Sequence, residues 1–96
     1  MFENPLRQAI LEMLRMRKGK SFCPSEVVRW IYPEAWRVFM IDVQDEMMRM
    51  YREGLILVSQ AGVPVPPDGF PKGPVRISPI TKPNAPKSVK ENKKRS

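Results

Sequence analysis

The sequence SFCPSEVV, residues 21–28, joins a short extended segment to the start of a helix. Pro24 lacks a backbone N–H, which costs nothing in the first turn of a helix. Glu26 lies three residues after Cys23, where its side chain can accept a hydrogen bond from the Cys23 N–H. We therefore expect the first two residues of the stretch to form a short strand and a helix to begin at Pro24.

A first helix is predicted before this stretch. Asn4 is a favourable N-cap, and Pro5 suits the first helical position. The apolar residues that follow recur at steps of three or four, which predicts one buried face. These residues are Leu6, Ala9, Ile10, Met13 and Leu14. The helix is expected to end near Lys18-Gly19, because glycine favours the left-handed backbone found after a helix end.

A third helical stretch is predicted after Pro33, which interrupts helical hydrogen bonding. Large apolar residues then recur at helical spacing from residue 36 to residue 51, and Gly54 ends the pattern. The spacing predicts one long helix whose buried face includes Trp36 and Phe39.

Two segments with β-propensity, residues 55–60 and 75–78, flank a stretch rich in proline and glycine, residues 61–74. We expect them to pair as a hairpin joined by a wide loop. The order of elements, a helix, a short strand, two helices and two strands, is that of a winged helix, an α+β fold. Residues 1–79 are therefore predicted to form one winged-helix domain, with the third helix in the recognition position and the loop as the wing.

The basic charge of the chain is concentrated at its C-terminal end. The 96 residues include 17 Lys and Arg and 10 Asp and Glu, a formal net charge of +7. Residues 80–96 hold six of the basic side chains, one acidic one and no aromatic residue. Because such a segment buries too little apolar surface to offset its ordering entropy, we expect a disordered basic tail. The residues before it hold 11 basic and 9 acidic side chains and are nearly balanced.

Four short runs of sequence have a distinctive combination of residues that can be compared with known families. They are Gly19-Lys20-Ser21-Phe22-Cys23-Pro24-Ser25-Glu26-Val27, Trp36-Arg37, Gly54-Leu55-Ile56 and Gly73-Pro74-Val75-Arg76-Ile77. Together they resemble the small bacterial family of domain-of-unknown-function 3253 proteins, and the resemblance spans roughly residues 5–78. The Cys-Pro-Ser-Glu helix start and the Gly-Pro-x-Arg strand are its most specific parts. The resemblance implies a winged-helix-like domain with no established activity.

The residue types that most catalytic and metal sites require are scarce. The chain has no histidine and one cysteine, so it lacks the commonest general base and cannot assemble a zinc site. No glycine-rich phosphate loop precedes a helix. We expect no enzyme, no catalytic residue, no cofactor and no metal. Cys23 is the one candidate for a reactive thiol, since a helix N-terminus and nearby Lys20 favour the thiolate; the alternative is a small packed side chain.

One functional hypothesis is weak, salt-sensitive binding to DNA or RNA. On the outward face of the third helix, Gln44 can pair with adenine and Arg49 with guanine, and Arg52 continues this face. Lys72 near the wing tip and Arg76 on its strand can reach phosphates, and the basic tail adds affinity by counterion release. Carboxylates on the same helix, expected on a solvated face, oppose docking in a major groove. They are Asp42, Asp45 and Glu46.

The alternative hypothesis is a protein-interaction module without catalysis. Trp30 lies beside Tyr32, one residue off the apolar stripe of its helix, and is expected to be partly exposed. Both residue types are common interface anchors, and packing in the core is the alternative for these side chains. Met48, together with Met50, extends this predicted surface. Arg76 also has an alternative role, in which it holds a carboxylate or a helix terminus inside the domain.

The sequence gives no indication of a membrane protein. No stretch approaches the roughly 18 consecutive apolar residues of a membrane span. The N-terminal residues lack the basic and apolar regions of a signal peptide. We therefore expect a cytoplasmic protein without membrane contact.

Overall fold

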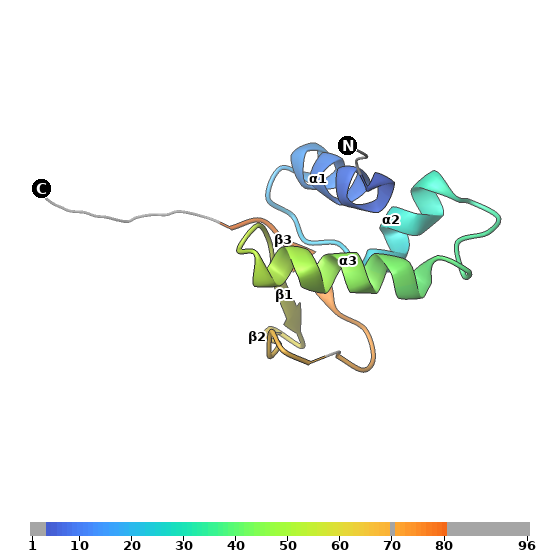
Figure 1. Ribbon diagram of the computed structural model, residues 1–96. Coiled ribbons are helices and arrows are strands. Elements are labelled where there is room, and N and C mark those ends of the chain that lie inside the picture. The colour runs from blue at the N-terminus through green and yellow to red at the C-terminus, as the bar shows by residue number, and fades with distance from the viewer. Residues whose placement is uncertain (1–3, 70, 81–96) are drawn as a thin grey trace, which may run out of the picture.

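The computed structural model describes residues 4–69 and 71–80 and contains three α-helices and a three-stranded antiparallel sheet (Figure 1). The helices are α1 (Pro5–Arg17), α2 (Pro24–Ile31) and α3 (Met40–Arg52). The strands are β1 (Leu57–Gln60), β2 (Val63–Pro64) and β3 (Arg76–Ser78). This is the predicted α+β arrangement, and it is winged-helix-like. The predicted tail, residues 80–96, lies outside the described residues except for Ile80.

The starts of α1 and α2 follow the capping rules that the sequence predicts. The Asn4 side-chain oxygen accepts a hydrogen bond from the Leu6 N–H at 2.9 Å. The Cys23 N–H donates to Glu26 Oε2 at 3.1 Å. Gly19, with φ of 95°, turns the chain away after α1, a conformation that costs glycine little. The predicted positions of both helices are confirmed.

The third helix begins later than predicted. Residues 33–39 form successive turns, in which the Phe39 N–H donates to the Trp36 carbonyl at 3.1 Å, and the α-helix starts at Met40. Spacing of three to four residues fits successive turns as well as a helix, so the pattern could not distinguish them. Trp36 is half-buried at the edge of the core, and the guanidinium carbons of Arg29 and Arg37 lie 4.1 and 4.5 Å from the centroid of its ring.

The sheet has the strand order β2-β1-β3, with both pairs antiparallel. The predicted hairpin is the β1–β3 pair, in which Val58 lies opposite Ile77. The predicted short strand before α2 is one bridge, formed by Phe22 and Ile77. The Phe22 N–H donates to the Ile77 carbonyl at 3.0 Å, and the Ile77 N–H donates to the Phe22 carbonyl at 2.6 Å. The segment before α2 is therefore fixed to the C-terminal strand.

Strand β2 lies inside the stretch predicted to be an irregular loop. Ala61 and Gly62 both have positive φ, 52° and 82°, and bring Val63 opposite Gln60. Two consecutive residues with positive φ suit a two-residue hairpin turn, but Asn or Gly is usual at the first of them. Because Ala61 stands there instead, the sequence did not indicate this turn.

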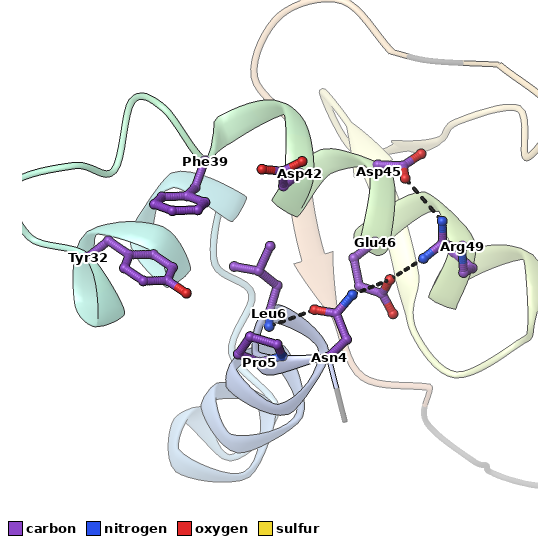
Figure 2. Close-up of a pocket in the computed structure, with 9 residues that line it drawn as sticks. All are labelled: Asn4, Pro5, Leu6, Tyr32, Phe39, Asp42, Asp45, Glu46 and Arg49. Carbon is purple, nitrogen blue, oxygen red and sulfur yellow. Dashed lines mark hydrogen bonds and ion pairs between the residues drawn. The ribbon is translucent and has the colours of Figure 1, made fainter. Parts of the chain in front are cut away.

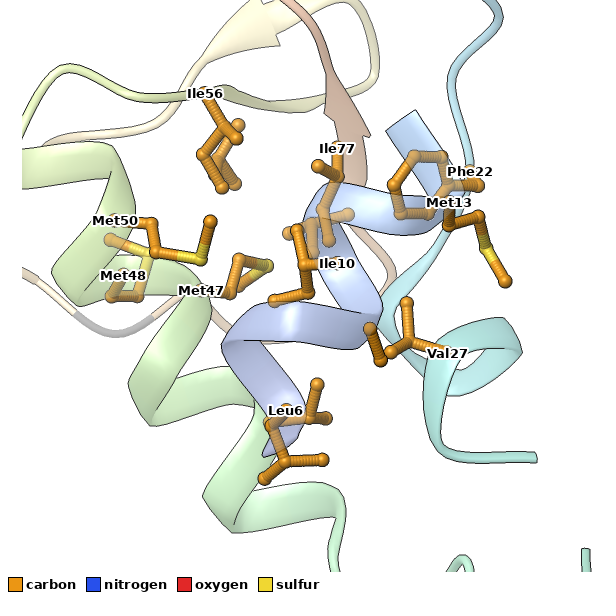
Figure 3. Packing of buried hydrophobic residues seen from close by; sticks show 14 of the residues in the cluster. Leu6, Ile10, Met13, Phe22, Val27, Met47, Met48, Met50, Ile56 and Ile77 are labelled. Carbon is orange, nitrogen blue, oxygen red and sulfur yellow. The ribbon is translucent and has the colours of Figure 1, made fainter. Parts of the chain in front are cut away.

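One buried apolar cluster joins the helices to the sheet (Figure 3). Helix α3 contacts α1, α2 and β1. Because these neighbours surround more than one side of the helix, more of its side chains are buried than a single apolar face would include. Met48 and Met50 are both 0% exposed, and the prediction that they form an exposed surface is wrong for this reason. The Tyr51 hydroxyl donates to the Val65 carbonyl at 2.7 Å and holds the start of the wing against α3.

Candidate functional site

The carboxylate of Glu46 lies at the centre of a polar network between α1 and α3. Its Oε2 accepts from Arg7 Nε at 2.5 Å, and its Oε1 accepts from Arg49 Nη1 at 2.5 Å and from Asn4 Nδ2 at 3.1 Å. Glu46 is 2% exposed, so its predicted place on a solvated face is wrong. Sequence spacing along α3 cannot show that α1 approaches at this point. The carboxylates of Glu53 and Glu46 raise the pKa of Arg7, which stays charged.

The two arginines predicted to read nucleic acid from α3 have partners within the domain. Besides Glu46, Arg49 contacts Asp45 through Nη2 at 3.1 Å. Arg52 Nη1 donates to the Pro67 carbonyl at 3.3 Å, a contact between α3 and the wing. These contacts use part of the hydrogen-bonding capacity of each guanidinium group and, for Arg49, offset its charge.

Arg76 contacts the segment that leads into α2. Its Nε donates to Ser21 Oγ at 3.1 Å and its Nη2 to the Ser21 carbonyl at 3.0 Å, while Nη1 lies 3.9 Å from Glu26 Oε2. These contacts match the alternative role predicted for Arg76 inside the domain. Burial opposes ionisation of Glu26, but hydrogen bonds from the Cys23 N–H and the Arg17 guanidinium outweigh it and lower the pKa of Glu26.

The remaining candidates from the sequence do not gather at one place. Gln44 and Cys23 line a small pocket of about 290 Å³, whereas Arg49 borders a different one. The Sγ atom of Cys23 lies 3.0 Å from Ser25 Oγ. Lys72 is exposed, and its carbonyl accepts a hydrogen bond from the Gln60 side chain. The five predicted nucleic-acid residues therefore do not share one pocket.

The larger pocket, of about 610 Å³, opens where the start of α1, the end of α2 and the first half of α3 meet. Figure 2 shows the rings of Tyr32 and Phe39 on one side and Glu46 with Arg49 on the other. The two rings are stacked, with centroids 4.1 Å apart and an interplanar angle of 18°. The other lining residues come from the N-terminal end of α1 and the first two turns of α3. They are Asn4, Pro5, Leu6, Asp42 and Asp45.

The walls of this pocket differ in chemistry. Stacked aromatic rings offer an apolar, electron-rich surface, which attracts both methylene groups and cations. Asp42 is exposed and has no ion-pair or hydrogen-bond partner within residues 4–69 and 71–80, whereas Asp45 is paired with Arg49. An apolar wall beside a free carboxylate suits a cationic group on an aliphatic stem.

Two of the three residues predicted for a protein interface are accessible. Trp30 is 46% exposed, so its expected partial exposure is confirmed. Tyr32 is half-buried and contributes one wall of the larger pocket. Met48 is buried and unavailable to a partner.

The sequence did not predict that Phe39 and Asp42 belong to one site. Their spacing of three residues places them on the same side of a helix, which was the only indication available. The joining of this side to Asn4 and Tyr32 depends on how the three helices pack, and no local pattern specifies that packing.

The part of the chain that the structure describes contains neither a metal-binding cluster nor a membrane-spanning helix. No group of three or more His, Cys, Asp or Glu residues there could hold a metal ion. Among the helices in residues 4–69 and 71–80, none has the length and apolar character needed to cross a membrane.

Three helices, a small antiparallel sheet and a wing held against the third helix define a winged-helix-like α+β domain. Residues 3–79 match the family described as "Protein of unknown function (DUF3253)". The chain belongs to this family, as the resemblance in its sequence predicted. A search of curated proteins finds no significant match. Since the family description states no activity, the function has to be inferred from the pocket and its surroundings.

Proposed function

We propose that this domain is a protein-interaction module that binds a basic segment of a partner protein. A Lys or Arg side chain of the partner enters the pocket between the three helices. The observation that carries the proposal is the free carboxylate of Asp42 beside the stacked rings of Tyr32 and Phe39. The module binds and does not catalyse.

The pocket walls match the two parts of such a side chain. The aliphatic stem packs against the rings of Tyr32 and Phe39, where methylene groups lose contact with water. The charged end lies near Asp42 and supplies the cation that this carboxylate lacks within the described residues. Asp45 adds negative potential beside it, although its own charge is partly offset by Arg49.

The charge of α3 supports a protein partner over DNA on this face. The helix carries three carboxylates and two guanidinium groups, and both arginines already have partners in the domain. Asp42 lies in the first turn of α3, the end that reaches bases in a major groove when a recognition helix docks. A phosphate backbone near Asp42 would be repelled.

A titration of the full chain with a lysine-containing peptide tests the proposal. Adding the peptide is expected to change the backbone amide chemical shifts of Tyr32, Phe39 and Asp42. A peptide with glutamate in place of lysine should change none of them. Asp42→Asn should weaken binding at least several-fold, because it removes the free charge and keeps the side-chain shape. Asp68→Asn, which alters an exposed carboxylate in the wing, is the matched control. Equal weakening by both variants would count against a specific site.

A second candidate function is salt-sensitive nucleic-acid binding, which one property of the sequence favours. Residues 80–96 carry six basic side chains and one acidic one, and Lys72 has no carboxylate partner within the described residues. Fluorescence anisotropy with random duplex DNA and RNA over a salt series tests it. Replacing the six basic residues of the segment by glutamine in the full chain should abolish binding if the segment supplies the affinity. Binding that survives would place the contacts in the folded domain.

A further inference from the structure

An exposed strip crosses from the α2–α3 connection onto the first turn of α3. Its members are Arg37, Val38, Ile41 and Asp42. Val38 and Ile41 are 74% and 71% exposed, the highest values among the large apolar side chains of the described residues. Apolar side chains this exposed and this close together are a common mark of an interaction surface.

The backbone places these four residues on one side. The Met40 N–H donates to the Arg37 carbonyl at 3.4 Å, and the Val43 N–H donates to the Phe39 carbonyl at 2.9 Å, so the chain winds continuously from the turns into α3. Residues three and four positions apart in such a winding are neighbours. Val43, on the other side, is buried. The strip therefore faces solvent as one surface.

The charges at the two ends of the strip are opposite, and neither has an ionic partner. Arg37 lies over the ring of Trp36, with its guanidinium carbon 4.5 Å from the ring centroid, and makes no ion pair within the described residues. Asp42 at the other end is likewise without a cation there. The order along the strip is thus basic, apolar, apolar, acidic.

This order is self-complementary when the strip meets a copy of itself in the opposite direction. We infer that a second copy of this chain binds here, related by a twofold axis that passes between Val38 and Ile41. Each Val38 then packs against Ile41 of the other copy, and each Arg37 lies against Asp42 of the other copy. An isologous contact of this kind repeats every pairing twice. A uniformly acidic partner would satisfy only one end of the strip, and an uncharged partner would satisfy neither.

The strip is small, so the association is expected to be weak. Stable dimers usually bury about 800 Å² on each partner, more than four side chains supply, and ion pairs at the edge of an interface contribute mainly to its orientation and specificity. Asp42 also belongs to the pocket described above. Dimerisation and binding of a basic segment therefore compete for one carboxylate, although the dimer does not depend on the proposed function.

Sedimentation equilibrium of the full chain over a wide concentration range tests the inference. A reversible monomer–dimer equilibrium is expected at high concentration. Val38→Asp and Ile41→Asp should each abolish the dimer. Each places a charge in the apolar centre of the interface, against the apolar side chain of the other copy. Val63→Asp is the matched control, since Val63 is 63% exposed on β2, and it should leave the dimer unchanged. Circular dichroism of each variant establishes that the fold is retained.

A charge exchange then tests the register. Arg37→Asp and Asp42→Arg should each weaken self-association about tenfold or more, because each brings like charges together twice. An equimolar mixture of the two variants should recover dimers, since every pair in the mixed dimer is again opposite in charge. A wild-type chain that stays monomeric at all concentrations would overturn the inference. So would a dimer that Val63→Asp disrupts, or a mixture no better than its components.

Discussion

Arg7 in α1 and Glu46 in α3 are joined by a hydrogen bond of 2.5 Å between Nε and Oε2. The side chain of Glu46 is 3% exposed, so its partners must replace the hydration that it loses on burial. A buried ion pair is seldom a large net source of stability, but removing one partner leaves the other charge less compensated, and Glu46 would then keep only Arg49 and Asn4. Because Glu46 also lines the larger pocket, the same bond aligns two walls of the candidate site.

Arg7→Leu is expected to destabilise the domain by roughly 2–4 kcal/mol, because Glu46 and Glu53 then lose a shared cation. Urea denaturation followed by circular dichroism measures the change. Arg15→Leu serves as the control, since Arg15 pairs with Glu12 on the exposed side of α1 and its loss should change stability little. Similar losses in both variants would show that the network around Glu46 has no special role.

The lowered pKa of Glu26 predicts weaker stability in acid. The folded-state pKa lies below that of the unfolded chain, so ionised Glu26 stabilises the fold above the unfolded value, about 4–5. That contribution disappears as the pH falls through the lower folded-state value. Glu26→Gln should therefore reduce stability at neutral pH and flatten its pH dependence in acid. Chemical denaturation between pH 3 and 7 measures this, with Glu34→Gln on the exposed turn as control. An unchanged slope in Glu26→Gln would contradict the assignment.

Met48 and Trp30 should respond to truncation in opposite ways. Met48→Ala removes a fully buried side chain from the core and should cost about 2–5 kcal/mol. Trp30→Ala changes a side chain that is 46% exposed and should cost much less, about 1 kcal/mol or below. Thermal and urea unfolding of the two variants provide the comparison. A larger loss for Trp30→Ala would mean that its buried half is central to packing.

The turn at Ala61 offers a stabilising substitution. Ala61 has φ of 52°, a conformation that asparagine tolerates better than alanine. Ala61→Asn should raise the free energy of unfolding by about 0.5–1 kcal/mol, because it relieves part of the left-handed backbone penalty of roughly 1–2 kcal/mol. Ala61→Val should lower it, because a β-branched side chain fits this backbone poorly. If both variants destabilise equally, then contacts of the alanine methyl group matter more than the backbone.

The local elements of the fold could be predicted because short-range chemistry specifies them. Asn4 and Pro5 mark the start of α1, and the spacing of Glu26 from Cys23 marks the start of α2. Ala61 gave no such indication of β2, since its positive φ is imposed by strand pairing and not by its own preference. The start of α3 was also misplaced, because Pro33 is followed by turns whose spacing imitates a helix.

The candidate site was less predictable because it depends on packing between helices. Asp42 and Glu46 both belong to an acidic stretch of α3, yet one is free and exposed whereas the other is buried beneath Arg7. The difference arises because α1 covers only one of them. Arg76 shows the same limit: its type suited a phosphate contact, but Ser21 and Glu26 occupy it. Residue type indicated which groups could act, and the tertiary contacts determined which of them are free.

The bridge between Phe22 and Ile77 has a consequence for how the chain folds. The two residues are distant in sequence, and Phe22, Val58 and Ile77 are all buried together with the helices. Contacts between distant segments form late, after the entropy of closing the intervening loop has been overcome. The helices can therefore associate early, but the core stays open on one side until β3 arrives. A chain that ends before β3 should leave Phe22 and Val58 uncovered and be prone to aggregation and proteolysis. A chain that ends just after β3 should close its core over these two residues.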